Sequence, residues 1–366
     1  MRFFAALPLI LALAAAPACA APQKLQDGPV AAAPAADPGA PLWHFETATP
    51  GLVAASCPAG VQNLDPLPID LMVSPLAAAD TARLNALMPS GATLAGAWEL
   101  SSRNPLFGGL SGLARLPEDE GGGLLAVTDE GHFAWITLEG GAPASAALSA
   151  MRRPDGQSFA SKQDMDAEGL LYQDGIALVS FERNHRIEAF ALGHCGAAAR
   201  AAQVASLPET QPATQGGRQI DPNQGAEAIF LTPQGTLGFG YEGTLGVSPL
   251  GEVLAGGTAR WTGVRAPAPR LHGLVAKEIA VHPQTGETLP IYLFRAWDPL
   301  RGNRIELRWG EGDPSVIRIS RPAPVDNFEG LAAEWLEDGR LRLWIISDDN
   351  FNRSQRTLLF AFDISL

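Results

Sequence analysis

Short apolar runs separated by turns recur along the chain and predict paired β-strands. Each unit has a β-rich run, a turn, a second β-rich run and an acidic or polar pair at its end, which is typical of a β-hairpin. Four clear units and one weaker copy follow this pattern: residues 109–116 with 124–131, 166–172 with 176–183, 224–231 with 236–243, 327–332 with 341–350, and, more weakly, 277–281 with 291–295. Helical pattern is scarce, and we expect one short helix within residues 76–88, where an Ala-rich strand or loop is the alternative.

The spacing of these units predicts a β-propeller. Equivalent positions lie 51 to 59 residues apart, at Gly112, Glu168, Glu227, Glu278 and Glu329. Such steps are longer than a WD40 repeat and fit four-stranded blades with long loops.

Residues 43–366 hold about six such steps, so we expect an all-β, six-bladed β-propeller. The sixth blade would combine residues 45–100 with the C-terminal strand 357–364. The ring would then be closed by N- and C-terminal strands, which removes the exposed edges of an open sheet.

The first 20 residues resemble a secretory signal peptide. Arg2 precedes an apolar run over residues 3–16, and Ala18 and Ala20 are the small residues that signal peptidase prefers, with cleavage near Ala20. This pattern predicts a periplasmic or secreted protein; an uncleaved anchor is the alternative, and lipidation of Cys19 is another. Residues 21–42 are Ala- and Pro-rich and indicate a flexible leader, which leaves residues 43–366 for the propeller domain.

Two cysteines remain once Cys19 leaves with the signal peptide. Cys57 and Cys195 are an even pair in an oxidising compartment, which favours one disulfide, although two unrelated buried thiols are the alternative. No Cys or His spacing typical of a structural zinc site is present.

The composition limits the class of partner. With 46% hydrophobic and 18% charged residues the chain can bury a real core. Its 39 acidic and 26 basic residues give a formal net charge of -13, which disfavours binding to nucleic acid. After the first 20 residues, no stretch approaches the roughly 20 apolar residues of a transmembrane helix.

Several short motifs resemble a known family. They are Ser111-Gly112-Leu113 with Val127-Thr128-Asp129, Glu168-Gly169-Leu170 with Ser180-Phe181-Glu182, and the C-terminal motif formed by residues 327–331, 347–352 and 355–359. Together they resemble the phytase-like domain family of secreted bacterial proteins, described as "esterase-like activity of phytase", over roughly residues 95–366. The sequence departs from it at Glu130, where a basic residue is expected. The resemblance implies a β-propeller that hydrolyses phosphate esters.

Acidic residues occupy equivalent places in successive units. In a propeller the innermost strands begin near one face of the central channel, so these side chains are expected to converge there. The candidate catalytic residues are Glu168, Glu227 and Glu329, which open the first strand of their units. The candidate metal ligands are Asp129, Glu182, Glu242, Asp348 and Asp349, which follow the second strand.

An oxygen-only cluster of this kind selects a hard cation, so we expect Ca²⁺, with Mg²⁺ as the alternative. The cation would bridge a phosphate to the acidic surface and activate water, while the carboxylates act as ligands or general base. In the alternative role, the acids accept hydrogen bonds from turn and neighbouring-blade amides and hold the ring together.

Two arginines are candidates for binding the anionic substrate. Arg183 and Arg356 are suited to clamp an anion bidentately, and exposed ion pairs with the abundant acids are their alternative role. The leading hypothesis is therefore a phytase-like, metal-dependent phosphoester hydrolase acting on an anionic small molecule.

Two other functional hypotheses remain open. One is a non-catalytic periplasmic propeller that binds a carbohydrate, lipid or envelope protein, because a fold does not fix a function. Tryptophans would then be stacking platforms, unless they pack between blades: Trp98, Trp135, Trp261, Trp297, Trp309 and Trp335. A serine esterase has little local support, because residues 108–112 lack the Gly-x-Ser-x-Gly spacing of a nucleophile elbow.

Overall fold

The apolar runs of the sequence form the inner strands of five antiparallel sheets. The computed structural model describes residues 39–243 and 246–366, which belong to one compact unit. The expected signal peptide (residues 1–20), Cys19 and residues 21–38 of the expected leader lie outside the described residues. In the described part, no helix has the length and apolar character needed to cross a membrane.

Each sheet extends from an innermost strand, near the central axis, to an outer edge. From the inside outward, the first sheet contains β4 (Leu110–Arg115), β5 (Leu124–Thr128), β6 (His132–Glu139), β7 (Ala142–Ala150) and β1 (Leu67–Ile69). The second contains β8 (Ala167–Gln173), β9 (Ile176–Phe181), β10 (Arg186–Phe190) and β11 (Ala202–Ser206). The third contains β12 (Ala226–Leu231), β13 (Leu237–Tyr241), β14 (Pro249–Val253) and β15 (Ala259–Arg265).

The last two sheets complete the set. The fourth contains β16 (Gly273–Val281), β17 (Thr288–Asp298), β18 (Gly302–Trp309) and β19 (Ser315–Ser320). The fifth contains β20 (Asn327–Trp335), β21 (Leu341–Asp348), β22 (Thr357–Ile364), β3 (Ala92–Ser102) and β2 (Leu71–Pro75). The helices are short: α1 (Phe45–Ser56), α2 (Ala78–Asn85), α3 (Lys162–Met165), α4 (Leu192–Cys195), and the 3₁₀ turns η1 (Glu118–Glu120) and η2 (Ala213–Gln215). The helix expected within residues 76–88 is α2.

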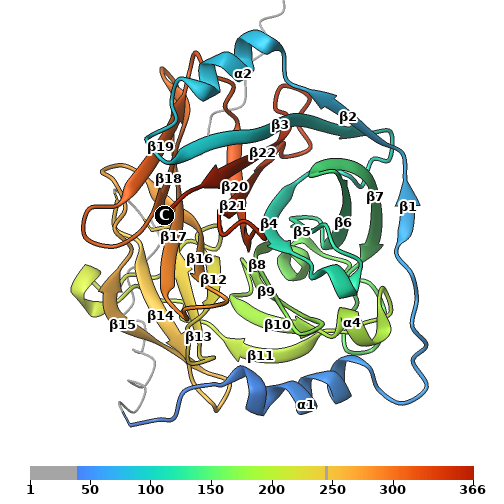
Figure 1. Ribbon diagram of the computed structural model, residues 1–366. Helices are drawn as coiled ribbons and strands as arrows, with labels where there is room; N and C mark the ends of the chain where they lie inside the picture. Colours follow the sequence, from blue (N-terminus) through green and yellow to red (C-terminus); the bar gives the residue numbers. More distant parts are fainter. Residues whose placement is uncertain (1–38, 244–245) are drawn as a thin grey trace, which may run out of the picture. The chain divides into compact units, whose positions relative to one another are not determined.

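The inner strands follow one another around a central axis. β4 packs against β8, β8 against β12, β12 against β16, β16 against β20, and β20 packs against β4 (Figure 1). The predicted hairpins are confirmed, including the weaker fourth one, and the predicted all-β propeller is confirmed.

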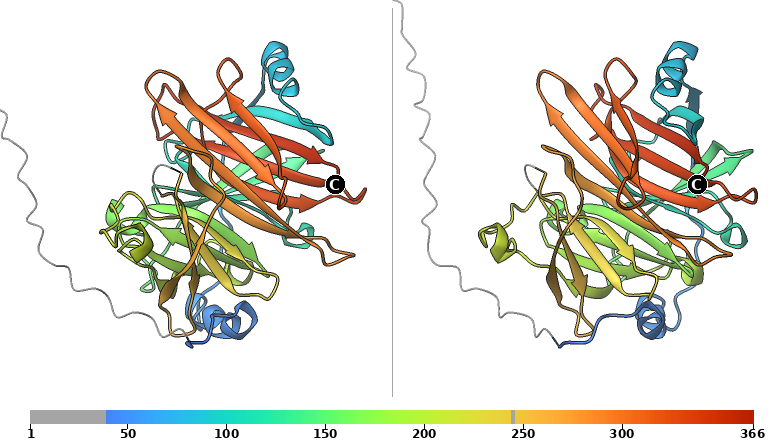
Figure 2. Two further views of the ribbon diagram at one scale, coloured as in Figure 1. Left: turned by 90° about the vertical axis from the view of Figure 1, so that its left-hand side faces the viewer. Right: turned by 60° about the vertical axis from the view of Figure 1, so that its left-hand side comes forward.

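The propeller has five blades, so the predicted count of six is wrong. The segment expected to supply a sixth blade makes no sheet of its own, because its one antiparallel pair, β2 with β3, is part of the fifth sheet. It forms α1, which lies against the second sheet, and then three strands that join existing sheets at their outer edges (Figures 1 and 2). β1 pairs with β7, and β3 pairs with β22. Dividing the length of the whole domain by the repeat length gave too many blades, because residues 45–100 do not form a repeat.

A β-bulge interrupts every inner strand at the same place. The register shifts between Leu110 and Leu113 in β4 and between Ala167 and Leu170 in β8. In the last three inner strands the shift skips a single residue: Glu227 in β12, Val275 in β16 and Glu329 in β20. A bulge leaves its extra residue unpaired and re-aims the side chain. The residue equivalent to the glutamates in the fourth blade is therefore Val275, so the choice of Glu278 as its marker was wrong.

In β8 and β20 a glycine follows the bulged glutamate, and the backbone of a neighbouring inner strand lies close to it. A Cβ added to Gly169 would lie 2.7 Å from the carbonyl oxygen of Glu227 on the next inner strand, and 2.5 Å from Ser180 Oγ. A Cβ added to Gly330 would lie 2.8 Å from the carbonyl oxygen of Ser111. The recurring Glu-Gly-Leu sequence is thus a packing requirement, since only glycine allows this approach of two backbones.

The core lies between the faces of neighbouring sheets. Between the fourth and fifth sheets, Leu293, Phe328 and Phe360 are fully buried in one apolar cluster. A disulfide joins Cys57, which directly follows α1, to Cys195 in α4. The two Cα atoms are 6.0 Å apart. The expected pairing is therefore present, and it fixes the N-terminal helix to the second blade.

Replacing Gly169 by Ala tests the packing of the inner strands. We expect Gly169→Ala to lower the free energy of unfolding by about 1–3 kcal/mol, because the added methyl group overpacks against backbone that cannot move freely. Gly256→Ala is the matched control, since a Cβ there meets nothing within 4 Å. Denaturant unfolding of both variants gives the comparison, and equal stability of the two would contradict this account.

Candidate active site

A polar cavity of about 910 Å³ opens where the inner strands begin. We call it the acidic cavity. Its carboxylates are those of Asp129, Asp166, Glu168, Glu182, Glu227, Glu242, Asp326, Glu329 and Asp348. Its cations are Lys162, Arg183, Arg295 and Arg321. The excess of acids is the main electrostatic feature of the site.

The three candidate catalytic residues converge in this cavity. Glu168, Glu227 and Glu329 occupy the bulge of β8, β12 and β20, and all three line the acidic cavity. At the equivalent bulge position, the first blade has Ser111 and the fourth blade has Val275. The convergence follows from the propeller geometry, which brings together residues that are far apart along the chain.

Four of the five candidate metal ligands line the same cavity. Asp129, Glu182 and Glu242 directly follow the second strands of the first three blades, and Asp348 ends that of the fifth blade. The fifth candidate, Asp349, does not line the cavity. Its carboxylate accepts hydrogen bonds from the backbone N–H of Gly109 at 2.9 Å and from Thr357 Oγ1 at 3.1 Å. Asp349 therefore has the alternative, structural role.

Arg295 is one of the site residues that sequence reasoning missed. Arg295 lies on β17, where it pairs across the sheet with Gly273 of β16. In the other blades the equivalent position holds an acid. Its guanidinium contacts Glu329 Oε1 and Glu242 Oε1, each at 3.1 Å, and also donates to Asn327. A signal was present, because Arg295 ends the weaker sequence unit at the place of the terminal acid in the others.

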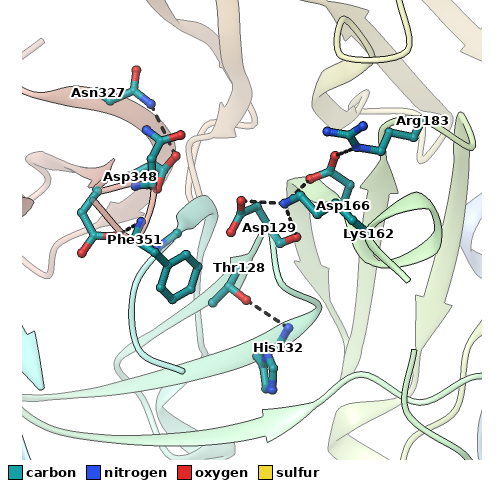
Figure 3. Close-up of polar contacts among 12 residues, drawn as sticks. Thr128, Asp129, His132, Lys162, Asp166, Arg183, Asn327, Asp348 and Phe351 are labelled. Atoms are coloured by element: carbon teal, nitrogen blue, oxygen red, sulfur yellow. Dashed lines mark hydrogen bonds and ion pairs between the residues drawn. The ribbon is translucent and has the colours of Figure 1, made fainter. Parts of the chain in front are cut away.

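A second set of charges connects the first two blades. Lys162, in α3, lies between Asp129 and Asp166, with its Nζ at 2.6 Å from Asp129 Oδ2 and 2.7 Å from Asp166 Oδ1 (Figure 3). Arg183 donates to the other oxygen of Asp166. Asp166 is thus already paired on both oxygens. Burial is the main cause that raises the pKa of Asp129.

The two candidate anion-binding arginines lie in different places. Arg183 lines the acidic cavity, although its Nε is engaged by Asp166. Arg356 is not among the lining residues, and its guanidinium lies 3.8 Å from Glu99 and 3.9 Å from Asp326. The structure therefore brings only Arg183 to the site.

Glu168 and Glu227 are carboxylates without a partner. Neither accepts a hydrogen bond or makes an ion pair with another residue of the described part, and Glu227 is only 7% exposed. Burial raises the pKa of both groups well above the usual range, and the surrounding carboxylates add to the effect. Burial also raises the pKa of Asp348, with Glu329 as the next cause. An unpaired buried charge is costly, so such groups take up protons or a cation.

Glu182 and Glu329 have partial compensation. Burial raises the pKa of Glu182 to about 7, although its Oε1 accepts the backbone N–H of Gly225. Burial raises the pKa of Glu329 as well, while the Arg295 guanidinium opposes that shift. Asn327 donates to Glu329 at 2.9 Å and to Asp348 at 3.4 Å. Hydrogen bonds and the ion pair therefore hold the carboxylates of Glu182 and Glu329 in place, whereas Glu168 and Glu227 have no such contacts.

The donor set fits a hard divalent cation. One carboxylate oxygen each from Asp166, Glu168 and Glu182 lie within 4.8 Å of one another. Lys162 and Arg183 already neutralise Asp166, whereas no ion pair of the described residues involves Glu168, Glu182 or, on the next inner strand, Glu227. The set holds oxygen ligands and neither Cys nor His, which suits Ca²⁺ or Mg²⁺ and disfavours zinc.

Fold and site together define a β-propeller with a carboxylate-rich central cavity. The sequence model of the family "Phytase-like: Esterase-like activity of phytase" matches residues 105–308, more than half of the chain. The protein belongs to this family, which confirms the resemblance found in the sequence motifs. No curated protein gives a significant sequence match.

Several solved structures are similar in fold. The PQQ-bound aldose sugar dehydrogenase from Streptomyces coelicolor is 13% identical, with 75% of this chain and 99% of that chain covered and a TM-score of 0.43. A thermostable family-43 glycoside hydrolase is also 13% identical, with 70% and 89% covered and a TM-score of 0.42. Similarity at this level supports no inference about the activity of this chain.

The raised pKa values predict how stability depends on pH without added metal. An acid whose pKa is higher in the folded state holds its proton there while the unfolded chain has lost it, so stability falls as pH rises between the two values. For Glu182 the window runs from about 4.5 to about 7, and its contribution is about 3 kcal/mol. We expect the free energy of unfolding, measured in chelator, to decrease from pH 5 to pH 8.

Neutralising one unpartnered acid isolates this effect. Glu227→Gln should be more stable than the native protein at pH 8, with a smaller difference at pH 5, because it removes an unpaired buried charge. Glu306→Gln is the matched control, since Glu306 is equally buried but bonded to Arg308 and Arg318. The free energy of unfolding of Glu306→Gln should be lower than that of the native protein by about 1–3 kcal/mol. Denaturant unfolding at both pH values decides, and a loss of stability at pH 8 in Glu227→Gln would contradict the prediction.

Proposed function

We propose that the protein is an exported phosphoester hydrolase that depends on a divalent cation, Ca²⁺ or Mg²⁺, in the acidic cavity. The observation that carries this proposal is the pair of unpartnered carboxylates, Glu168 and Glu227, beside Glu182 on the wall of a large polar cavity. Membership of the phytase-like family supports phosphate esters as the substrate class. Export is supported by the disulfide between Cys57 and Cys195, because disulfides persist in oxidising compartments.

Glu168, Glu227 and Glu182 would hold the cation. From the sequence, Glu168 and Glu227 were expected to be catalytic residues. We assign them to cation binding instead, because neither has a counter-charge. When bound, a divalent cation offsets the charge of a phosphate and lowers the pKa of a coordinated water.

The remaining groups orient the reaction and move protons. Arg295 holds the carboxylates of Glu329 and Glu242 in place and opposes the rise in the pKa of Glu329 that burial causes, and Glu329 in its ionised form is suited to accept a proton from the attacking water. Lys162 and Arg183 place positive charge on the opposite wall, where they neutralise Asp129 and Asp166 and reduce the repulsion of an anionic substrate.

Activity on a generic phosphomonoester tests this function. We expect the protein to hydrolyse 4-nitrophenyl phosphate in the presence of Ca²⁺ or Mg²⁺ and to lose that activity in chelator. Glu168→Gln and Glu329→Gln should each lower kcat/KM by about 100-fold or more, the usual effect of removing a group that stabilises the transition state. Glu278→Gln is the control, because Glu278 is a buried acid that lines a different cavity. Chelator-insensitive hydrolysis, or equal activity in all variants, would contradict the proposal.

Cation binding can be measured apart from turnover. Added Ca²⁺ should raise the Tm of the native protein, since a ligand of the folded state stabilises it. The rise should be lost in Glu168→Gln and kept in Glu278→Gln. A Tm rise without hydrolysis would favour the alternative of a non-catalytic binding propeller. Trp297 favours that alternative, because it is 65% exposed and lines the acidic cavity as a stacking platform for a sugar ring.

A further inference from the structure

A second cavity of about 460 Å³ lies at the opposite ends of the inner strands. Its floor includes one residue from each inner strand, two positions beyond the bulged residue: Leu113, Leu170, Ile229, Lys277 and Leu331. We call these five residues the belt. Its rim consists of turn residues and of the start of α1, with Glu46, Gln173, Asp174, Thr232 and Gln234 among them.

The belt separates the second cavity from the acidic cavity. The same five residues line a passage of only about 10 Å³, whose other lining residues include Glu227 and Glu329 of the acidic cavity. A small molecule in the second cavity would therefore not reach the acidic cavity. The two ends of the channel are chemically independent sites.

Lys277 breaks the pattern of the belt. The other four belt residues are aliphatic, whereas Lys277 brings an ammonium group to the same level. Its Nζ lies 3.5 Å from the centroid of the Phe230 ring and 5.5 Å from that of Tyr292, and it makes no ion pair with any residue of the described part. Burial lowers the pKa of Lys277 to about 8, since no anion compensates its charge.

The surroundings restrict what could supply that anion. Arg115 also lines the cavity, but its guanidinium is already paired with Glu334 and Glu118. Glu278 lines it too, but burial raises the pKa of that carboxyl group to about 8, which favours its neutral form at pH 7. Glu46 and Asp174 at the rim repel molecules with several negative charges. One uncompensated cation on an aliphatic floor is thus suited to a single carboxylate.

We propose that the second cavity binds a small organic monocarboxylate, whose carboxylate pairs with the ammonium group of Lys277 and whose body fills the space between the belt and the rim. A cavity of this size is typical of small-molecule sites, which combine apolar walls with a few placed polar groups. The Phe230 ring, which also lines the cavity, stabilises the ammonium group by a cation–π contact. This site is independent of the phosphoester chemistry proposed for the acidic cavity.

Amine labelling on the full protein tests the proposal directly. The sequence has only three lysines, Lys24, Lys162 and Lys277, so acylation of each with a small anhydride can be followed by peptide mass spectrometry. Benzoate and glucuronate are the probes, used up to about 10 mM, which is ten times the Kd of a weak millimolar ligand. We expect at least one of them to slow acylation of Lys277 threefold or more and to leave Lys162 unaffected. The uncharged benzamide and methyl glucoside should not protect Lys277.

A variant provides the second measurement. The protecting probe should raise the Tm of the native protein and of Lys162→Met, and should not raise that of Lys277→Met. If neither carboxylate protects Lys277, or if the uncharged analogues protect it equally, the proposal is wrong. An equal Tm rise in Lys277→Met would also overturn it. Labelling uses the native protein, so the test holds even if Lys277→Met folds poorly.

Discussion

The close approach of neighbouring inner strands around the axis is the constraint on which the rest of the structure depends. Between the first two blades, the next strand's backbone lies where a side chain at Gly112 would be, and the same holds at Gly169 and Gly330. The chain meets this constraint with a bulge followed by a small residue, which is glycine in three inner strands and alanine (Ala228 and Ala276) in the other two. The bulge turns its extra residue toward one mouth of the channel, and the residue after the small one belongs to the belt. Packing and site geometry therefore have one cause.

That geometry creates an electrostatic problem that the protein solves only in part. Carboxylates from four blades face one cavity, and like charges at short range destabilise the folded state. Arg295 compensates Glu242 and Glu329, and Lys162 compensates Asp129 and Asp166. Glu168, Glu182, Glu227 and Asp348 form no ion pair within the described residues, and of these Glu168 and Glu227 also accept no hydrogen bond. A purely structural propeller has no need to gather uncompensated acids around one cavity, so this remainder is the strongest sign of a ligand.

The hairpins and the convergence of Glu168, Glu227 and Glu329 could be predicted because strand periodicity and repeat spacing are local properties. The blade count could not, since β1 and β3 pair with strands that are distant in the chain, β7 and β22, and β2 only extends the fifth sheet beyond β3. Lys162 was missed because α3 lies in a loop between blades, where no periodic pattern marks a residue. Asp349 was misassigned because adjacent acids at a strand end look alike in sequence, although one faces the cavity and the other holds a turn.

The fourth blade shows why a weak repeat can be informative. Its inner hairpin was the hardest to recognise because it departs from the pattern at three positions. Val275 replaces the bulged glutamate, Arg295 replaces the acid at the end of the second strand, and Lys277 replaces an aliphatic residue of the belt. Each departure replaces an acidic or aliphatic residue with one of different charge or polarity. The four similar blades build the frame and supply the negative charge. The dissimilar blade adds a cation to each end of the channel, Arg295 among the acids of one mouth and Lys277 among the aliphatic residues of the other.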